Sequence, residues 1–285
     1  MDTSELRSRY VMAGRIRTHY SEAGCNGPAV VFCHGGGPGS SGEAGFGRIM
    51  PALATRFQVY AIDSIGGFGE TDPYALASEG VQSRVYELEL FIDALGFEQV
   101  FLSGNSQGAW VAAKYALEHP DRVSKLALIA SSTIAQAMGI KTPVTEGMRA
   151  IRAYDGSPDS MRRFLQTIVY NQSLITDNLV SLRNETANRP GASEARRIFQ
   201  EGTQRLNSDP NLRLNFEMIH NLPRLTIPMI FIWGEDDRFA PMEIGKELER
   251  LLPSVRFHYI AQAGHQVQND QPEVVSKLML EFFGS

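Results

Sequence analysis

A five-residue segment, Gly104–Gly108, places one serine between two glycines in the order Gly-Asn-Ser-Gln-Gly. It follows an apolar run at 100–102 and precedes a run with helical spacing at 109–119. Glycines let a chain turn sharply, and a serine at the centre of a strand-to-helix turn is held in a strained position with its hydroxyl exposed. The segment therefore predicts that Ser106 is a nucleophile. Glycine and serine are common in loops, so it is the flanking strand and helix patterns that give this motif its weight.

Serine is a poor nucleophile at neutral pH and needs an adjacent base, which a third group orients. Two later segments supply candidates. Asp236 and Asp237 follow an apolar run at 229–232, and His265 follows the next strand-like run. The carboxyl ends of parallel strands lie along one edge of a sheet, so we expect Ser106, one aspartate and His265 to converge there.

The segment 34–39, His-Gly-Gly-Gly-Pro-Gly, can meet another need of this chemistry. A tetrahedral intermediate requires two backbone N–H groups aimed at its oxyanion. One comes from the residue after the nucleophile, Gln107, and the other from a glycine-rich loop of this type. A dinucleotide-binding loop is the competing interpretation, but the segment is not a G-x-G-x-x-G that opens a helix. We expect His34 to support the loop and the histidines without informative context to be structural or exposed: His19, His119, His220 and His258.

Strand-like and helix-like runs alternate in two parts of the chain. The predicted strands are 16–23, 29–34, 57–65, 100–103, 126–130, 228–233 and 255–260, and the predicted helices are 81–95, 109–119, 242–252 and 272–283. This alternation indicates an α/β fold with a parallel, doubly wound sheet. From 132 to 223 helical spacing replaces the strand pattern, at 160–170, 177–187 and 193–206. We therefore expect an α/β core of residues 1–131 and 224–285 and an inserted helical cap of residues 132–223.

Composition sets limits on the class of protein. The chain has 285 residues, 43% of them hydrophobic, and a net charge of −5. This length can bury a large core, while the acidic balance argues against nucleic acid as a partner. No apolar run approaches a membrane span and Met1–Tyr10 lacks an apolar signal core, so we expect no membrane partner and a cytoplasmic location. The two cysteines, Cys25 and Cys33, indicate neither a disulfide framework nor a metal site.

Taken together, these segments resemble the α/β-hydrolase superfamily over essentially the whole chain, including its order of serine, aspartate and histidine. Within it, the chain is most similar to the meta-cleavage-product hydrolases. Those enzymes hydrolyse a carbon–carbon bond in 2-hydroxy-6-oxo-hexa-2,4-dienoates, which form when bacteria open aromatic rings. The elbow and triad are general to the superfamily. The more specific matches are the loop 34–39, Asn105 before the serine, and the segment 170–176 that leads to Arg183.

The resemblance implies a role for each matching position. Ser106 would be the nucleophile, His265 the base, and Asp237 the group that orients the histidine, with Asp236 as the alternative. Gly36 and Gln107 would form the oxyanion hole. The implied substrate-binding residues are Asn105, Arg183, Gly37 and Gln266, with Asn105 and Arg183 at the carboxylate end. Arginine suits that task because its planar fork matches a carboxylate.

The implied reaction has two stages. The dienol first ketonises, with His265 moving the proton. Ser106 or an activated water then attacks the ketone, and the carbon–carbon bond breaks with a stabilised dienolate as the leaving group. The resemblance implies a small-molecule substrate, no metal or organic cofactor, and a homo-oligomeric assembly.

Several positions depart from the family pattern. Gln266 stands where the family usually has tryptophan, Gly45 where it has asparagine, and Gln107 where methionine is frequent. The turn at 65–69 lacks the usual proline. The glutamines would make part of the pocket more polar, so we hypothesise a substrate with a polar or unusually shaped ketone substituent.

Three other functions remain open at this point. A carboxylic-ester hydrolase or lactonase would use the same triad, although the loop 34–39 and Arg183 argue against it. A proline-iminopeptidase-like enzyme would also fit the Gly-Pro-Gly loop, but it needs acidic cap residues that the sequence does not identify. A small-molecule receptor on this fold would bind ligand without turnover, and its binding would not depend on Ser106.

Overall fold

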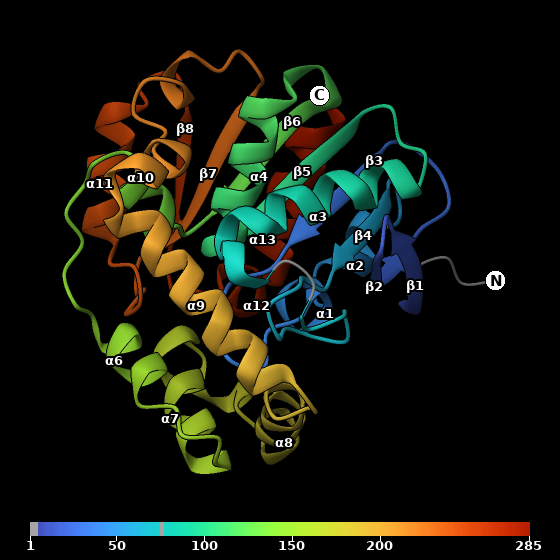
Figure 1. The fold of residues 1–285 in the computed structure, drawn as a ribbon. Coiled ribbons are helices and arrows are strands. Elements are labelled where there is room, and N and C mark those ends of the chain that lie inside the picture. The colour runs from blue at the N-terminus through green and yellow to red at the C-terminus, as the bar shows by residue number, and fades with distance from the viewer. Residues whose placement is uncertain (1–4, 75–76) are drawn as a thin grey trace.

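An eight-stranded sheet forms the centre of the protein, which a computed structural model describes for residues 5–74 and 77–285 (Figure 1). The strand order is β1-β2-β4-β3-β5-β6-β7-β8. β1 pairs with β2 and β2 with β4 in antiparallel fashion, and the other neighbouring strands are parallel. The mostly parallel sheet confirms the predicted fold class. The strands are β1 (Arg7–Ala13), β2 (Ile16–Ala23), β3 (Ala29–Cys33), β4 (Gln58–Ile62), β5 (Val100–Asn105), β6 (Val123–Ile129), β7 (Met229–Gly234) and β8 (Arg256–Ile260).

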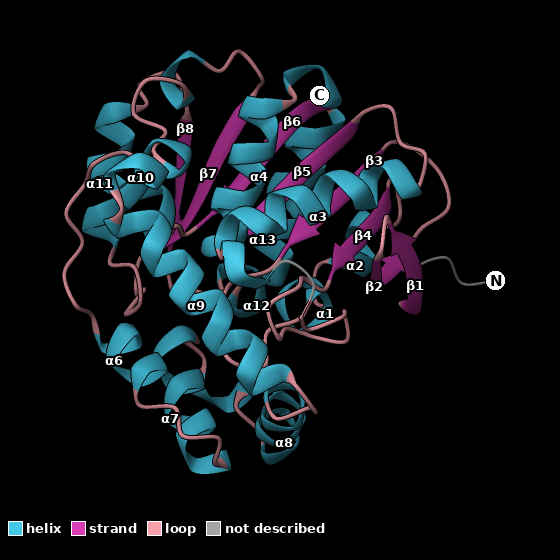
Figure 2. Cartoon of the chain, viewed as in Figure 1, coloured by secondary structure: helices cyan, strands magenta, loops and turns pink. Residues whose placement is uncertain are grey.

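Helices lie in front of the sheet and behind it (Figure 2). Among the described residues, none of them is both long and apolar enough to span a membrane. The helices are α1 (Gly42–Phe46), α2 (Met50–Leu53), α3 (Val81–Ala94), α4 (Gln107–Glu118), α5 (Ser132–Ala137), α6 (Glu146–Arg152), α7 (Pro158–Ile168), α8 (Asp177–Ala187), α9 (Ala192–Ser208), α10 (Pro210–Phe216), α11 (Met242–Leu251), α12 (Val267–Asp270) and α13 (Pro272–Gly284).

The central strands are buried on both faces, which explains their uniformly apolar sequences. Every residue of β3 and of β7 is buried. Strands covered by helices on both faces show such continuous apolar runs. β1, at the edge of the sheet, lacks such a run: most of its residues are exposed, and it was not predicted as a strand. Its ladder with β2 turns at Gly14, whose φ of +60° favours glycine.

The segment between β6 and β7 contains only helices, α5 to α10, as its spacing predicted (Figure 1). Thr145, Ser157 and Thr176 cap α6, α7 and α8, each accepting a hydrogen bond from a first-turn amide. A second hydrophobic cluster, separate from the main core, lies within α7 and α8 and their neighbours. α5, α9 and α10 contribute instead to the main core. The division of the chain at 131/132 and 223/224 therefore stays a prediction.

Strand order reverses at β3, which lies between β4 and β5. Loops that leave neighbouring strands at such a switch point diverge and create a crevice at the carboxyl edge of the sheet. In this protein the two diverging connections are the glycine loop after β3 and the turn from β5 into α4. That turn packs tightly: a Cβ on Gly108 would overlap the carbonyl oxygen of Cys33, and one on Gly104 would overlap that of Gly108. Glycine is therefore required at positions 104 and 108, because any side chain there would overlap backbone atoms of neighbouring residues.

We predict that Gly108→Ala destabilises the fold by about 3 kcal/mol, because neither the elbow nor β3 can move away from the added methyl group. Gly45→Ala is the matched control, since its Cβ would meet only the His34 side chain and Cα at ordinary contact distances. Urea denaturation of both variants measures the difference. Equal stability of the two variants would contradict the account of the elbow.

Candidate active site

The backbone of Ser106 is strained and is held by its neighbours. Its φ is 58° and its ψ is −120°, a conformation that non-glycine residues rarely adopt. Its N–H donates to the carbonyl oxygen of Ile129 at 2.8 Å, and its own carbonyl accepts from Ser131 Oγ at 2.6 Å. Ile129 is the last residue of β6, the strand beside β5, and Ser131 follows two residues later. Sequence reasoning missed Ser131, although its position as the N-cap of α5 is recognisable.

His265 and Asp237 form a buried pair. His265 Nδ1 lies 2.7 Å from Asp237 Oδ2, and the other carboxylate oxygen accepts from the backbone N–H groups of Phe239 and Ala240, each at 2.7 Å. A proton on Nδ1 that is donated to Asp237 leaves Nε2 as an acceptor. Nε2 is buried and has no hydrogen-bond partner among the described residues. Asp236, the alternative candidate, is exposed.

Asn105 joins the elbow to the histidine loop. Its Nδ2 donates to the carbonyl oxygen of His265 at 3.0 Å and lies 3.4 Å from that of Ile129. The predicted substrate-binding residue therefore also fixes the backbone of the predicted base. Its side chain lines the same cavity as Ser106.

A cavity of about 140 Å³ brings most of the predicted site residues together. Ser106 and His265 both line it, although no hydrogen bond joins them. Such bonds are often long without substrate and tighten on binding. Gln107 is the first residue of α4, so its N–H lies outside the intrahelical ladder and is open to an oxyanion. The other predicted residues that line the cavity are Gly36, Gly37, Asn105 and Gln266.

A buried arginine that sequence reasoning missed lies behind the two segments predicted to form the oxyanion hole. Arg84 of α3 donates to Gln107 Oε1 at 3.0 Å and to the His34 carbonyl oxygen at 2.6 Å. One guanidinium thus ties the glycine loop to the residue after the nucleophile. His34 supports the loop as predicted: its Nε2 accepts from the Ser64 N–H at 3.0 Å. Burial, with a further contribution from Arg84, holds the pKa of His34 well below its usual range, so the ring stays neutral.

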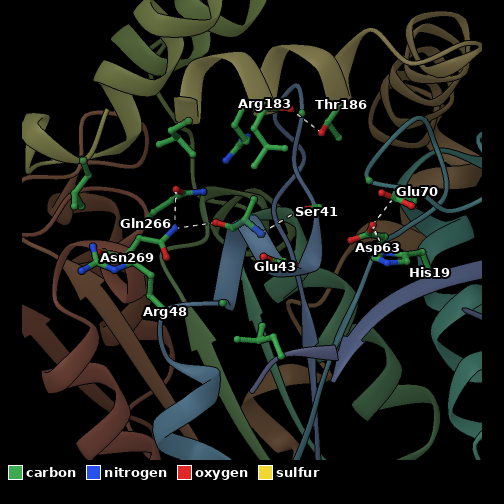
Figure 3. Close-up of a pocket in the computed structure, with 18 of the residues that line it drawn as sticks. His19, Ser41, Glu43, Arg48, Asp63, Glu70, Arg183, Thr186, Gln266 and Asn269 are labelled. Atoms are coloured by element: carbon green, nitrogen blue, oxygen red, sulfur yellow. Dashed lines mark hydrogen bonds and ion pairs between the residues drawn. The ribbon is translucent and has the colours of Figure 1, made fainter. Parts of the chain in front are cut away.

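Arg183 lines a larger pocket of about 510 Å³ beside this cavity (Figure 3). It projects from α8 and is only 2% exposed. Its Nη2 reaches the Pro38 carbonyl oxygen at 3.3 Å and Ser40 Oγ at 3.5 Å, and no carboxylate pairs with it among the described residues. Burial lowers its pKa to about 10, which leaves it charged at neutral pH. Gln266 lines both spaces, so the structure brings Arg183 next to the Ser106 cavity rather than into it.

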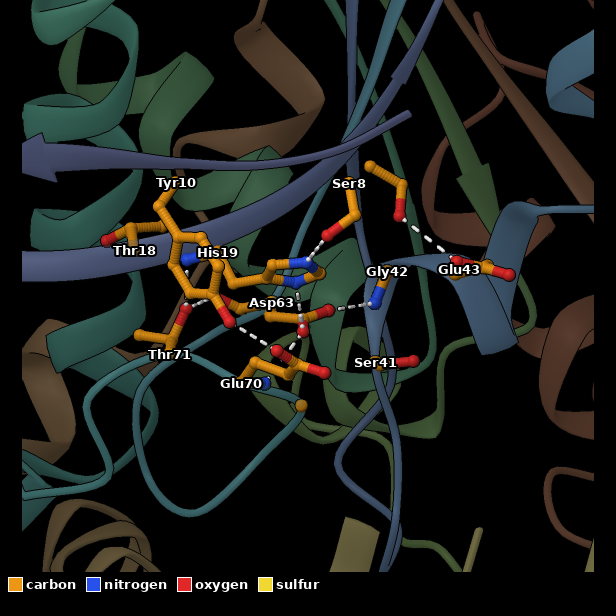
Figure 4. A network of polar contacts seen from close by, with 12 residues as sticks. Ser8, Tyr10, Thr18, His19, Ser41, Gly42, Glu43, Asp63, Glu70 and Thr71 are labelled. Atoms are coloured by element: carbon orange, nitrogen blue, oxygen red, sulfur yellow. Dashed lines mark hydrogen bonds and ion pairs between the residues drawn. The ribbon is translucent and has the colours of Figure 1, made fainter. Parts of the chain in front are cut away.

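A second histidine–aspartate pair, His19 and Asp63, also lines that pocket (Figure 3) and takes part in a network of polar contacts (Figure 4). His19 Nδ1 is 2.7 Å from Asp63 Oδ2, and its Nε2 is 2.8 Å from Ser8 Oγ. Ser8 belongs to the extended edge strand β1 and has no positive φ, unlike Ser106. Asp63 also accepts from the N–H groups of Gly42 and Glu70, at 2.6 and 2.8 Å. These bonds tie the edge strands to two loops, which is a structural role.

Groups of three or more potential ligands that could hold a metal ion do not occur in the part of the chain that the structure describes.

Comparison with known proteins identifies the family of this chain. The α/β hydrolase fold family matches residues 28–272. A 2-hydroxy-6-oxononadienedioate/2-hydroxy-6-oxononatrienedioate hydrolase of Paraburkholderia phymatum is 31% identical, over 99% of this chain and 97% of its own length. A 2-hydroxy-6-oxo-2,4-heptadienoate hydrolase of Pseudomonas putida is 32% identical, over 97% of this chain and 96% of its own.

Solved structures give the same relationship. A meta-cleavage product hydrolase from Pseudomonas fluorescens superposes with a TM-score of 0.81 and 28% identity, covering 97% of each chain. The 2-hydroxy-6-oxo-6-phenylhexa-2,4-dienoate hydrolase from a Rhodococcus species superposes with a TM-score of 0.83 and 25% identity, covering 99% of each. The chain therefore belongs to the α/β hydrolase fold family. Its similarity to meta-cleavage-product hydrolases, predicted from the motifs, is confirmed.

We predict that Asp237→Asn slows labelling of Ser106 by a fluorophosphonate about 10²- to 10⁴-fold, because the amide would favour the wrong tautomer of His265. Asp236→Asn, one residue away and exposed, provides the matched control and should label at the wild-type rate. Mass spectrometry of the labelled protein measures both the rate and the site. Similar slowing in the two variants would contradict the assignment of Asp237.

Glu87, a buried residue behind the site, should make the stability of the fold depend on pH. It lies one turn from Arg84 on α3, and burial raises the pKa of its carboxyl to about 8. The folded state then binds more protons than the unfolded state between about pH 4.5 and about pH 8, so stability should fall as pH rises through that window. Glu87→Gln should flatten this slope in denaturation measured across the window, whereas Glu79→Gln, an exposed control, should not. An unchanged slope in Glu87→Gln would contradict the assignment.

Proposed function

We propose that this protein hydrolyses a carbon–carbon bond in a 2-hydroxy-6-oxo-hexa-2,4-dienoate, a product of meta ring cleavage in bacterial aromatic degradation. The observation that carries the proposal is Arg183. A buried guanidinium without a carboxylate partner is costly unless an anion reaches it. It lines a pocket that meets the Ser106 cavity at Gln266. A molecule with a carboxylate at one end and a ketone further along fits this arrangement, and the relatives named above act on such molecules.

In the first stage the substrate binds with its carboxylate at Arg183. The 2-hydroxyl proton is transferred to C5 through His265 Nε2, the acceptor that Asp237 keeps in the required tautomer. The dienol becomes a ketone at C2, and C5 becomes saturated. This step makes the later bond cleavage feasible, because the electrons released at C5 can now delocalise into the new C2 carbonyl.

In the second stage Ser106 Oγ, or a water activated by His265, attacks the C6 carbonyl carbon. The negative charge that develops on the carbonyl oxygen is stabilised by the N–H groups of Gly36 and Gln107. The C5–C6 bond then breaks, a dienolate leaves, and His265 returns its proton. If Ser106 attacks, water hydrolyses the acyl-enzyme. Arg84 holds both oxyanion segments and so acts as a positioning residue.

The remaining sequence-based expectations form part of the proposal. Residues 132–223 would act as a cap over the site, with Phe164 and Ile168 of α7 lining the cavity at Ser106. The second hydrophobic cluster supports a cap that holds its own shape. A homo-oligomeric state, which the family resemblance implies, and a cytoplasmic location complete the proposal.

We predict that Arg183→Met lowers kcat/KM for a yellow dienoate about 10²-fold, because a charge-assisted, bidentate contact to the carboxylate is lost. Hydrolysis of p-nitrophenyl acetate, which has no carboxylate, should change by less than about twofold. Loss of the dienoate absorbance measures the first reaction and release of nitrophenolate the second.

Two controls accompany this experiment. Ser106→Ala should abolish both activities, and Arg163→Met, an exposed cap arginine, should affect neither. An equal loss of ester and dienoate turnover in Arg183→Met, with an unchanged melting temperature, would favour an ordinary ester hydrolase. Persistence of the dienoate with wild-type protein would overturn the proposal.

A further inference from the structure

The loop that carries His265 lies directly against the end of α7, in the helical segment between β6 and β7. The N–H of Gln266 donates to the carbonyl oxygen of Ile168, the last residue of α7, at 3.0 Å. On the other side of His265, a Cβ on Gly264 would lie only 3.1 Å from that carbonyl oxygen and 3.1 Å from the Tyr170 nitrogen. The two residues that flank His265 therefore both contact one short segment of the chain.

The carboxylate of Asp270 makes a second link between these two parts of the chain. Asp270 is the last residue of α12, the short helix after the loop. Its Oδ1 accepts from the N–H groups of Tyr170 and Asn171, at 3.1 and 3.0 Å. Its Oδ2 accepts from the N–H groups of Tyr170 and Gly264, each at 2.9 Å. One carboxylate therefore holds both the chain that leaves α7 and the backbone just before His265.

Residues 168–171, called the α7 exit here, lie between the parts of the helical segment that reach the proposed substrate. Ile168 lines the Ser106 cavity, and Val169 lines the Arg183 pocket. The chain then continues into α8, which carries Arg183 and packs with α7 in the second hydrophobic cluster. The α7 exit and the arginine proposed to hold the substrate carboxylate thus belong to one packed unit.

The helix α12 is bonded on its other side to the core. Gln268 Nε2 donates to the Gly45 carbonyl oxygen at 2.9 Å, and Asn269 Nδ2 donates to that of Ala44 at 2.9 Å. These bonds attach α12 to α1, the helix that follows the glycine loop. Asp270, the next residue, therefore lies where an element fixed to the core meets the α7 exit.

We propose that Asp270 is a positioning residue that holds His265 and the α7 exit in one arrangement, so that the base meets a substrate whose carboxylate lies at Arg183. This inference rests on the proposed function and goes beyond it, because it assigns a role to a residue outside the triad and the oxyanion hole. The described residues that line the Ser106 cavity and the Arg183 pocket do not include Asp270, so it acts through the backbone groups that it binds.

The contacts of Asp270 require two accepting oxygens. An ionised carboxylate only accepts hydrogen bonds, whereas an amide has one accepting oxygen and one donating NH2 group. In Asp270→Asn, an oxygen at the Oδ1 position would leave the Gly264 N–H facing the NH2 group, and an oxygen at the Oδ2 position would do the same to the Asn171 N–H. Either orientation places two donors against each other and releases one side of the link.

The test compares a yellow dienoate with p-nitrophenyl acetate in Asp270→Asn. The variant should lower kcat for the dienoate about 10-fold and change its KM by less than about threefold, because misplacement of a catalytic group by about 1 Å is costly. Ester hydrolysis should change by less than about twofold, since a small ester can follow a displaced base and a substrate anchored at Arg183 cannot. Asp270→Glu, which keeps two accepting oxygens on a longer side chain, should show the same selective loss in smaller degree, about threefold.

Two further variants isolate the link between the base and the substrate anchor. Glu273→Gln removes a negative charge from an exposed site near Asp270 and should leave both reactions unchanged. In an Arg183→Met background, Asp270→Asn should lower dienoate turnover by less than about twofold, because the substrate is then no longer anchored at Arg183.

An equal loss of dienoate and ester turnover in both Asp270 variants would overturn the positioning role while leaving the proposed function standing. An unchanged kcat for the dienoate in Asp270→Asn, or effects of Asp270→Asn and Arg183→Met that multiply in the double variant, would do the same. A wild type that does not consume the dienoate would overturn both.

Discussion

The strained backbone of Ser106 is the constraint on which the rest of the site depends. A φ of 58° at a serine is costly, by roughly 1–3 kcal/mol, and persists only where the surroundings over-determine it. Here β5, α4 and the end of β6 do so, through the Ile129 and Ser131 hydrogen bonds and the close contacts of the flanking glycines. The same packing places the hydroxyl at the carboxyl edge of the sheet, where the loops after β3, β7 and β8 can reach it.

Around this point the protein organises charge in two layers. The inner layer consists of the Asp237–His265 pair and of Gly36 and Gln107, which line the cavity at Ser106 and are the proposed oxyanion donors. The outer layer consists of two buried arginines, Arg84 and Arg183, which contact different parts of the site. Arg84 ties together the two segments proposed to form the oxyanion hole, while Arg183 has no carboxylate partner among the described residues and lies at the end of the pocket where we propose that the substrate carboxylate binds.

Much of this was predictable because it depends on local sequence. Four strands and four helices have their predicted bounds within a residue: β2, β3, β7, β8, α3, α8, α11 and α13. The predicted strand 57–65 ends early, at Ile62. The Asp63 N–H still donates to the His19 carbonyl of β2, but the N–H groups of Ser64 and Ile65 donate to side chains, His34 Nε2 and the Glu87 carboxylate. The triad candidates also follow from local motifs, and the structure makes the choice between Asp236 and Asp237, since only Asp237 is buried against His265.

Other parts of the site were not predictable, because they depend on contacts between distant segments. Arg84 lies in an ordinary amphipathic helix, and its importance appears only when α3 packs behind the glycine loop. The edge strand β1 was missed because its alternating charged residues resemble a loop until they pair with β2.

A crystal structure of the Ser106→Ala protein with a bound dienoate would test the central claim most directly. The account predicts the dienoate carboxylate in contact with the Arg183 guanidinium and the C6 carbonyl oxygen about 2.7–3.1 Å from the N–H groups of Gly36 and Gln107. A substrate bound in the reverse direction, with its ketone away from Gly36 and Gln107 and its dienoate carboxylate away from Arg183, would contradict it.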